Sequence, residues 1–473
     1  MSNVTASARE SMVHVNDMHS KLNPCWVSAI SRPRSLLDLQ FLVSHARSAK
    51  QSISIAGARH AMGGQQFGER TLHCDMTGLD TVRRLDCDRG LVEVEAGITW
   101  PKLVAELHRL QGDHDAPWTI AQKQTGADRL TIGGAVAANI HGRGLRMKPF
   151  VDDIEALSIV DSDGQVKRCS RTQHRELFAC VVGGYGLFGI VYSVTLRLVR
   201  RSKMERIVEI TTIDHVADKL ASRAEEGFTF GDFQYMTDER SDDYLRKGVL
   251  SCYRKVSPDK PLCEGRRELS PSDWRLLTHL SHSDKGKAYA MYSSHYQSTS
   301  GQIYWSDSLQ MSTYLDNYHQ WLDQETGCRT PGSEMITELY VPRQKLEQFM
   351  ANCRDDFRRQ GVNVIYGTVR LIEQEHETLL AWAREDWACI IFNLHVDHTP
   401  TGILHAADAF RCLIDRALEL GGTYYLTYHR FATHAQVLRA YPAIPEFFRA
   451  KRACDPDEVF SSDWYRHYRN IGE

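Results

Sequence analysis

The stretch Ser52–Gln66, SISIAGARHAMGGQQ, decides the fold class when it is set beside Thr131–Gly144, TIGGAVAANIHGRG. Each combines a glycine-rich turn with a histidine, next to a β-like run. Glycine allows positive φ and lets a ligand approach the backbone closely, and successive N–H groups in such turns form anion-binding nests. Two such turns predict a large diphosphate cofactor held by the backbone. The alternative is a pair of ordinary tight turns.

Composition is that of a globular protein, with 42% hydrophobic and 25% charged residues in a chain of 473. The net charge of −3 argues against a nucleic-acid binder, which usually has a basic surface. No apolar run reaches membrane-spanning length, and the first 20 residues lack the apolar region of a secretory signal. We therefore expect no integral membrane segment and a small molecule as the substrate.

The 12 cysteines are scattered, with no C-x-x-C pair, which is typical of reduced thiols in a cytoplasmic protein. The 21 histidines invite a metal hypothesis, but no H-E-x-x-H motif or Cys/His cluster supports it. We expect a cytoplasmic protein without a metal site.

Periodicity predicts an α+β protein in which antiparallel strands are covered by helices. Residues 203–330 are more polar and less periodic. The expected helices are 36–49, 100–111, 175–179, 343–360 and 405–420, and the expected strands are 52–56, 72–75, 92–96, 154–160, 335–341, 363–372, 389–398 and 423–430.

Several phrases together resemble the FAD-binding domain of the vanillyl-alcohol-oxidase superfamily, which is of the PCMH type. They are IAGARHAMGG, VEVEAGITWPKLVAELHRLQ, TIGGAVAANIHGRG, GGYGLFGIVYSVTLRL and, near the C-terminus, DPDEVFSSDW. Within that superfamily the chain is most similar to the branch of sugar, polyol and aldonolactone oxidases, which includes decaprenylphosphoryl-ribose oxidase.

The resemblance implies a two-part FAD-binding domain, formed by residues 1–203 and a returning segment, 431–473. It also implies an inserted α+β substrate or cap domain, 204–430, built on an antiparallel sheet. Residues 1–20 are expected to be disordered because they are polar. The implied reaction is oxidation of an alcohol carbon (a sugar, polyol, lactone or similar CH–OH donor) by hydride transfer to flavin N5.

The resemblance also assigns the residues that hold FAD. His60 lies where many relatives attach the flavin covalently, although Arg59 and Ala61 replace the usual glycine and serine. Ile140 lies where glycine accompanies oxidase behaviour, so the resemblance favours a dehydrogenase whose electron acceptor is unknown. The expected FAD-binding residues are Gly57, Ala58, Arg59, His60, Ala61, Gly63, Gly64, Gln65, Thr125, Gly126, Ile132, Gly133, Gly134, Ala137, Asn139, His141, Gly142, Gly189, Ile190 and Val191.

Alternation along three later strands places polar side chains on one face of each. Glu338 shares a face with Tyr340, Thr368 with Arg370, and Asn393 with His395. Such a mixture is typical of a cofactor-facing cleft, whereas a half-exposed sheet facing water is the alternative. We expect Glu338, Arg370 and His395 to line one cavity over the flavin. Tyr340, Thr368, Arg370 and Asn393 are the expected substrate-binding residues.

Tyr428 lies where the sugar branch has a lysine close to the flavin, and His429 would face the opposite way on a regular strand. The candidates for the base that takes the hydroxyl proton are therefore His395 and Tyr428, with His429 third. Arg370 would steady the developing negative charge. Two alternatives remain, namely a flavin-dependent reductase using a nicotinamide nucleotide and a non-catalytic flavin-binding module.

Overall fold

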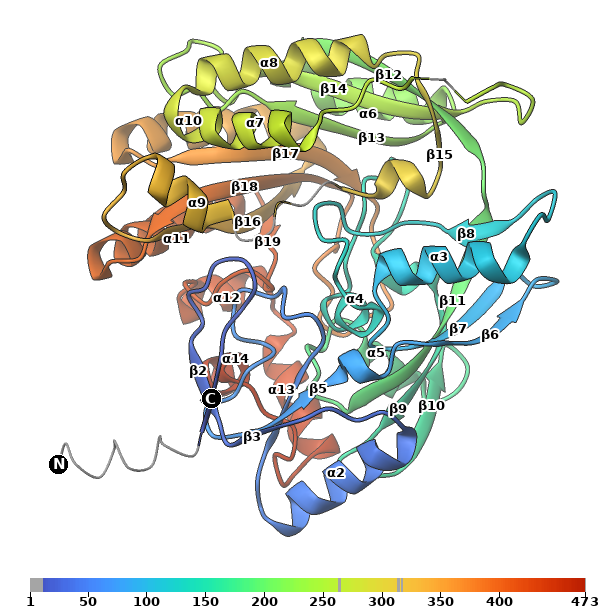
Figure 1. Cartoon of the computed structure of the whole chain (residues 1–473). Coiled ribbons are helices and arrows are strands. Elements are labelled where there is room, and N and C mark those ends of the chain that lie inside the picture. Colours follow the sequence, from blue (N-terminus) through green and yellow to red (C-terminus); the bar gives the residue numbers. More distant parts are fainter. Residues whose placement is uncertain (1–11, 263–264, 313–314, 316–317, 473) are drawn as a thin grey trace.

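The computed structural model describes residues 12–262, 265–312, 315 and 318–472 (Figure 1). Its largest element is an antiparallel sheet of eight strands, at the top of Figure 1. In spatial order the strands are β15 (Ile303–Trp305), β12 (Lys203–Thr212), β14 (Lys247–Lys255), β13 (Phe228–Tyr235), β17 (Val364–Ile372), β18 (Trp387–Asp397), β16 (Gly332–Pro342) and β19 (Thr423–Tyr424).

Helices lie over both faces of this sheet. On one face, Phe349 and Phe357 of α10 pack against Phe392 of β18. On the other face, α7 lies against β17, and α8 against β12 and β14. The helices associated with this sheet are α6 (Val216–Glu225), α7 (Pro271–Ser283), α8 (Lys285–Ser298), α9 (Tyr318–Glu325), α10 (Leu346–Gln360) and α11 (Pro400–Glu419).

A second antiparallel sheet has six strands and carries the long strand β11 at its centre. Helix α3 begins after Thr99 with a proline in its first turn and ends at Gly112. The elements of this part are β6 (Val82–Asp86), β7 (Leu91–Glu95), α3 (Trp100–Gln111), β8 (Trp118–Ile120), α4 (Ile132–Ala138), β9 (Ile154–Val160), β10 (Val166–Ser170), α5 (Arg175–Val181) and β11 (Ile190–Arg200).

Two small sheets bring both ends of the described chain together. In the parallel sheet, β5 (Leu72–Asp75) lies between β3 (Ala29–Ser31) and β4 (Ile53–Ala56), and α2 (Leu36–Ser48) connects β3 to β4. Phe460 forms a parallel bridge with Ile53, so the C-terminal residues lie beside β4. The remaining helices are α12 (His434–Ala440), α13 (Ile444–Cys454) and α14 (Asp463–Tyr468), and the 3₁₀ turns are Met76–Gly78, Phe150–Asp153, Ile213–His215, Ser308–Gln310 and Arg343–Lys345.

The other small sheet includes part of residues 1–20, so the expected disorder of this segment is wrong for the residues that the structure describes. Strand β1 (Val13–Val15) pairs with β2 (Cys25–Val27), and residues 1–11 lie outside the described part. Val15 packs with Phe67 in a small core, and the Asp17 carboxylate accepts from the backbone N–H groups of His19 and Ser20. These contacts order a polar segment that has little periodicity of its own.

The expected mixture of helices and antiparallel strands is confirmed, but the expected strand over 423–430 is wrong beyond Tyr424. After Tyr424 the chain leaves the sheet and lies against the first glycine turn. The Leu426 carbonyl accepts from the Gln65 side chain, and the Thr427 carbonyl accepts from the Met62 N–H. These bonds replace the ladder that alternation alone predicted.

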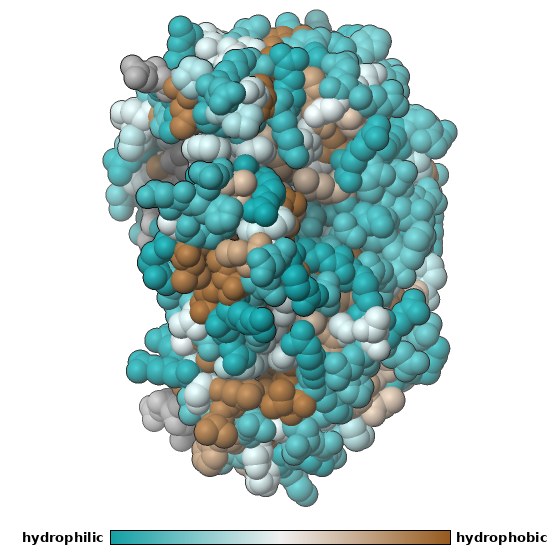
Figure 2. Space-filling model, turned by 90° about the vertical axis from the view of Figure 1, so that its right-hand side faces the viewer, coloured by the Kyte–Doolittle hydropathy of each residue, from teal (hydrophilic) through white to brown (hydrophobic). Residues whose placement is uncertain are grey.

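Figure 2 shows a largely hydrophilic face on which hydrophobic residues gather in small areas. In the described part of the chain, none of the helices combines the length and the apolar character that a membrane span requires.

Candidate functional site

A cavity of about 690 Å³ lies between the glycine turns and the eight-stranded sheet. The glycine turns contribute small side chains and bare backbone to one part of its wall. The sheet contributes residues of β16, β17 and β18, and helices α7 and α8 contribute Trp274, Leu277, Tyr289, Tyr292 and Tyr296. The cavity is therefore built from segments that lie far apart in the sequence.

Most of the residues expected to hold FAD line this cavity, but some lie behind its wall. Gly57–Ala61, Gln65, Thr125, Gly126, Gly133, Gly134, Ala137, Gly189 and Val191 line it, whereas Gly63, Gly64, Ile132, Asn139, His141, Gly142 and Ile190 do not. Asn139 instead accepts a hydrogen bond from the Val151 N–H. Ile132 and Ile190 are core residues.

The glycine turns fit a long ligand that approaches the backbone. A Cβ on Gly57 would clash with the Thr131 side chain, and one on Gly133 would lie 2.9 Å from the Cβ of Ala96. Side chains are thus excluded there by neighbouring structure, so the backbone is the surface that faces the cavity. This is the cradle that a dinucleotide such as FAD requires.

His60 lies on the cavity wall beside a second histidine that sequence reasoning missed. Its Nδ1 is 2.6 Å from Nε2 of His19. Burial lowers the pKa of His60 to about 3 and that of His19 to about 4, so both imidazoles are neutral at pH 7. The backbone at Arg59 has a positive φ of 59° and turns His60 toward the cavity.

The alternation along the sheet holds in the structure. Tyr366, Thr368 and Arg370 of β17 line the cavity together with Ile391 and Asn393 of β18. On β16, the residues that line it are Glu334 and Ile336. Glu338 and Tyr340 lie further along the same face of β16 and are fully buried, so neither reaches the cavity surface.

Arg370 is a buried cation that points into the cavity. It is 5% exposed, and it forms no hydrogen bond or ion pair with any residue that the structure describes. A buried guanidinium without a direct ion pair is costly. The arrangement therefore supplies a site for negative charge in the cavity.

Tyr428 faces the same part of the cavity. Its hydroxyl oxygen accepts a hydrogen bond of 2.9 Å from the Gln124 side chain. Burial, together with the nearby carboxylate of Glu338, raises its pKa well above the usual value for tyrosine, while Arg370 opposes this effect. Tyr428 is thus a neutral phenol held between a carboxylate and a guanidinium.

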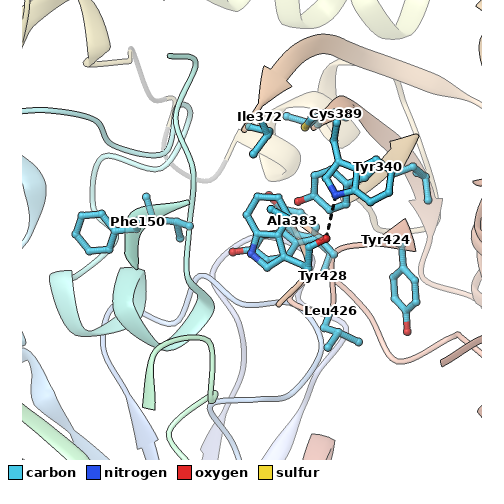
Figure 3. Close-up of a cluster of buried hydrophobic side chains, with 14 of the residues drawn as sticks. Phe150, Tyr340, Ile372, Ala383, Cys389, Tyr424, Leu426 and Tyr428 are labelled. Atoms are coloured by element: carbon cyan, nitrogen blue, oxygen red, sulfur yellow. Dashed lines mark hydrogen bonds between the residues drawn. The ribbon is translucent and has the colours of Figure 1, made fainter. Parts of the chain in front are cut away.

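Glu338 lies behind Tyr428 in a buried polar cluster. Its Oε1 contacts Nε2 of His141 and accepts from the hydroxyl of Tyr340 and the thiol of Cys389, both at 3.0 Å. Figure 3 shows Tyr340 and Cys389 on the sheet, with Tyr428 below them. Burial favours the neutral acid, but His141, Cys389 and Arg370 lower the pKa of Glu338 to about 2, so it stays ionised.

His395 is not where the sequence placed it, because alternation fixes the face of a strand but not the position along it. In the register of β17 and β18, Arg370 lies opposite Cys389. His395 is six residues further along β18, which is about 20 Å away at about 3.3 Å per residue. It does not line the cavity, so the expectation of one cavity lined by Glu338, Arg370 and His395 is wrong.

His429 is also remote from the cavity. Its ring stacks on Phe410 with the centroids 4.4 Å apart, and its Nε2 is 3.2 Å from the Thr337 hydroxyl. Burial lowers its pKa to about 3. The structure places it as a packed core histidine, whereas its neighbour Tyr428 faces the cavity.

Sequence reasoning missed the cavity residues of α7 and α8, in the region of weak periodicity. The spacing of Tyr289, Tyr292 and Tyr296 is that of one helix face and could have indicated them. It also missed Arg143, which follows His141–Gly142 directly. The Arg143 guanidinium stacks over Tyr253 at 4.8 Å and pairs with Asp232 at 3.4 Å.

Comparisons with known proteins also indicate that this chain binds FAD. Residues 27–170 match a family model described as an FAD binding domain. An uncharacterised oxidoreductase of the fasciation locus of Rhodococcoides fascians is 25% identical, over 71% of this chain and 70% of that protein. Decaprenylphosphoryl-β-D-ribose oxidase of Mycolicibacterium smegmatis is 22% identical, over 85% and 87%. Cytokinin dehydrogenase 1 of Arabidopsis thaliana is 25% identical, over 52% and 40%.

The FAD-binding match covers the glycine turns that line the cavity, and the likeness to the ribose oxidase extends over 85% of the chain. FAD is therefore the cofactor, and the glycine turns are the part of the cavity that fits it. The chain thus carries an FAD-binding domain at residues 27–170 and is similar over most of its length to oxidoreductases such as the mycobacterial ribose oxidase.

Proposed function

We propose that this FAD-dependent oxidoreductase oxidises an alcohol carbon, and that its redox site lies at Arg370 and Tyr428. The observation that carries the proposal is the pairing of a buried, unpartnered guanidinium with a phenol on the same part of the cavity wall. In this proposal residues 1–203 and 431–473 hold FAD, and residues 204–430 form the cap that bears both groups.

Each side chain has one task in the proposed reaction. The substrate hydroxyl donates to the Tyr428 oxygen, and the phenol proton moves toward Glu338, whose Oε2 has no hydrogen-bond partner within the described chain. Arg370 stabilises the negative charge that develops on the substrate oxygen. When bound, FAD supplies N5 as the hydride acceptor. The substrate thus loses a hydride and a proton and becomes a carbonyl compound.

The charge of the site favours an alcohol over an amine. Arg370 would repel a protonated amine but stabilise an alkoxide-like oxygen, and the nearby Glu338 is already engaged by His141. A relative named as a ribose oxidase covers most of the chain, whereas the likeness to a cytokinin dehydrogenase covers about half of it. Both considerations support a sugar, polyol or lactone donor.

The proposal is tested by anaerobic mixing of the purified yellow protein with sugars, polyols, lactones and aromatic alcohols. Loss of the flavin absorbance with at least one CH–OH compound is expected. Rapid loss with NADPH alone would instead identify a nicotinamide-dependent reductase. No loss with any donor would leave a flavin-binding protein without this activity.

Flavin attachment gives the first specific prediction. We expect FAD to remain with the wild-type protein after acid precipitation, because His60 is a neutral nucleophile on the cavity wall and His19 can accept its Nδ1 proton. His60→Ala should still bind FAD but release it in acid, whereas exposed His114→Ala should behave as wild type. Complete release of FAD from the wild-type protein would contradict covalent attachment.

The second prediction concerns the electron acceptor. Ile140 lines the cavity and is 1% exposed, so its branched side chain occupies space that oxygen would need. An acceptor dye should therefore outpace oxygen in the wild-type protein. In Ile140→Gly, reoxidation by air should become faster while the rate with the dye stays the same. Fast peroxide formation by wild type, unchanged in the variant, would refute this role.

A further inference from the structure

A second polar cluster lies on the cavity wall far from Arg370. It joins four elements through His282 of α7, His319 of α9, Glu334 of β16 and His395 of β18. His282, His319 and Glu334 line the cavity, and His395 lies behind them. The redox site proposed above uses none of these groups.

Three imidazoles converge on the single carboxylate of Glu334. His282 Nε2 is 3.2 Å and His395 Nδ1 is 3.4 Å from its Oε1, and His319 Nδ1 is 2.9 Å from its Oε2. Ligands at about 2.0–2.1 Å from a tetrahedral zinc ion lie about 3.3 Å from one another. The spacings of His282 and His395 from Oε1 are therefore those of neighbouring ligands around one ion.

Ordinary hydrogen bonding does not account for the whole cluster. Nε2 of His282 is buried and has no hydrogen-bond partner among the described residues, although it lies close to Glu334. The side chains of Glu334 and His282 are only 3% and 9% exposed. An enclosed imidazole nitrogen that lies 3.2 Å from a carboxylate oxygen without hydrogen-bond geometry is placed as one of two neighbouring ligands of a cation would be.

The cluster offers the kinds of ligand atom that suit a cation. A metal ion binds an ionised carboxylate and neutral imidazoles, and the cluster supplies one carboxylate with imidazole nitrogens around it. Nitrogen and oxygen ligands of this kind suit zinc better than calcium or magnesium.

We propose that His282, Glu334 and His395 bind one zinc ion on the cavity wall, while His319 and the Tyr318 hydroxyl contact the second oxygen of Glu334 and orient it. The ion would join α7 to β16 and β18 and so fix the wall on that side. It would lie at the His395 end of the sheet, about 20 Å along β18 from the position opposite Arg370. It is thus a site separate from the hydride-transfer chemistry.

The test is zinc binding by the FAD-loaded protein after treatment with EDTA and desalting, followed by calorimetric titration with zinc chloride. We expect one high-affinity equivalent in wild type. His395→Ala and Glu334→Gln should each weaken it on the order of 100-fold. His279→Ala is the matched control, because His279 lies on α7 next to Glu325 and away from Glu334. Zinc bound by the exposed thiols Cys328 and Cys454 is common to all variants and cancels in the comparison.

Thermal unfolding gives an independent readout. Zinc should raise the Tm of wild type and of His279→Ala, because a ligand of the native state stabilises it, but should not raise that of His395→Ala. His282→Ala replaces Glu334→Gln if the latter fails to fold. Wild type that binds zinc no better than His395→Ala would overturn the proposal and leave Glu334 as a hydrogen-bonded hub only. This outcome is independent of the alcohol-oxidation test.

Discussion

Tyr428→Phe is expected to slow flavin reduction by saturating substrate by about 10²–10⁴-fold, the usual contribution of a positioned acid–base group. The phenol oxygen is the group at the cavity surface that faces both Arg370 and Glu338, and phenylalanine removes it while keeping the ring. Binding of FAD should not change, because the substitution removes one hydroxyl and leaves intact the backbone contacts by which this segment meets the first glycine turn. Anaerobic stopped-flow absorbance of the flavin measures the effect.

Tyr425→Phe provides the matched control for this experiment. Its ring lies 5.6 Å from that of Tyr428, but its hydroxyl donates to the Ala138 carbonyl instead of facing the cavity. Its rate of flavin reduction should remain near that of wild type. Normal reduction in Tyr428→Phe would show that the hydroxyl proton leaves by another route, and equal loss in both variants would indicate a packing effect.

Arg370→Met is expected to lower kcat/KM by about 10²–10³-fold, because one preorganised group that stabilises developing charge contributes that much. It should also raise the Tm, since methionine removes a buried cation that forms no direct ion pair with the described residues. Steady-state kinetics and thermal unfolding are measured on the same preparation. Lower activity together with a higher Tm is the result expected for a charge that serves function at a cost in stability.

Two outcomes would contradict this role of Arg370. A lower Tm together with lower activity would mean that the guanidinium supports the fold. Unchanged kcat/KM with a higher Tm would mean that the charge is not used by the substrate. Arg370→Lys should recover part of the activity, because lysine keeps the charge but not the planar fork. Arg354→Ala, on α10 over the other face of the sheet, serves as the control.

Local sequence patterns were sufficient for many individual elements. Apolar spacing predicted a helix over Trp100–Gln111, and the structure has α3 there. Alternation in β17 correctly put Thr368 and Arg370 on one face. Both signals act over a few residues, through backbone geometry that is nearly independent of the rest of the chain.

The strand expected over 423–430 is wrong because contacts with a distant segment outweigh the local pattern. The segment does alternate. However, Gln65 and Met62, more than 350 residues earlier, donate hydrogen bonds to the carbonyls of Leu426 and Thr427. A long-range partner therefore decided the conformation of a segment whose local preference pointed elsewhere. The same departure from the sheet turns Tyr428 toward the cavity and His429 into the core.

By itself, the sequence determined the α+β class, the glycine turns and the face that each strand presents, because these follow from local backbone preference and residue type. Only the tertiary structure decided which of those faces meet and where. The register of β17 against β18 set Arg370 opposite Cys389 and about 20 Å from His395. The same packing brought His282, His319, Glu334 and His395 together from separate elements. Their spacing along the chain does not indicate this cluster. Register and packing are settled by contacts between distant segments, and a single sequence does not encode those contacts as a local pattern.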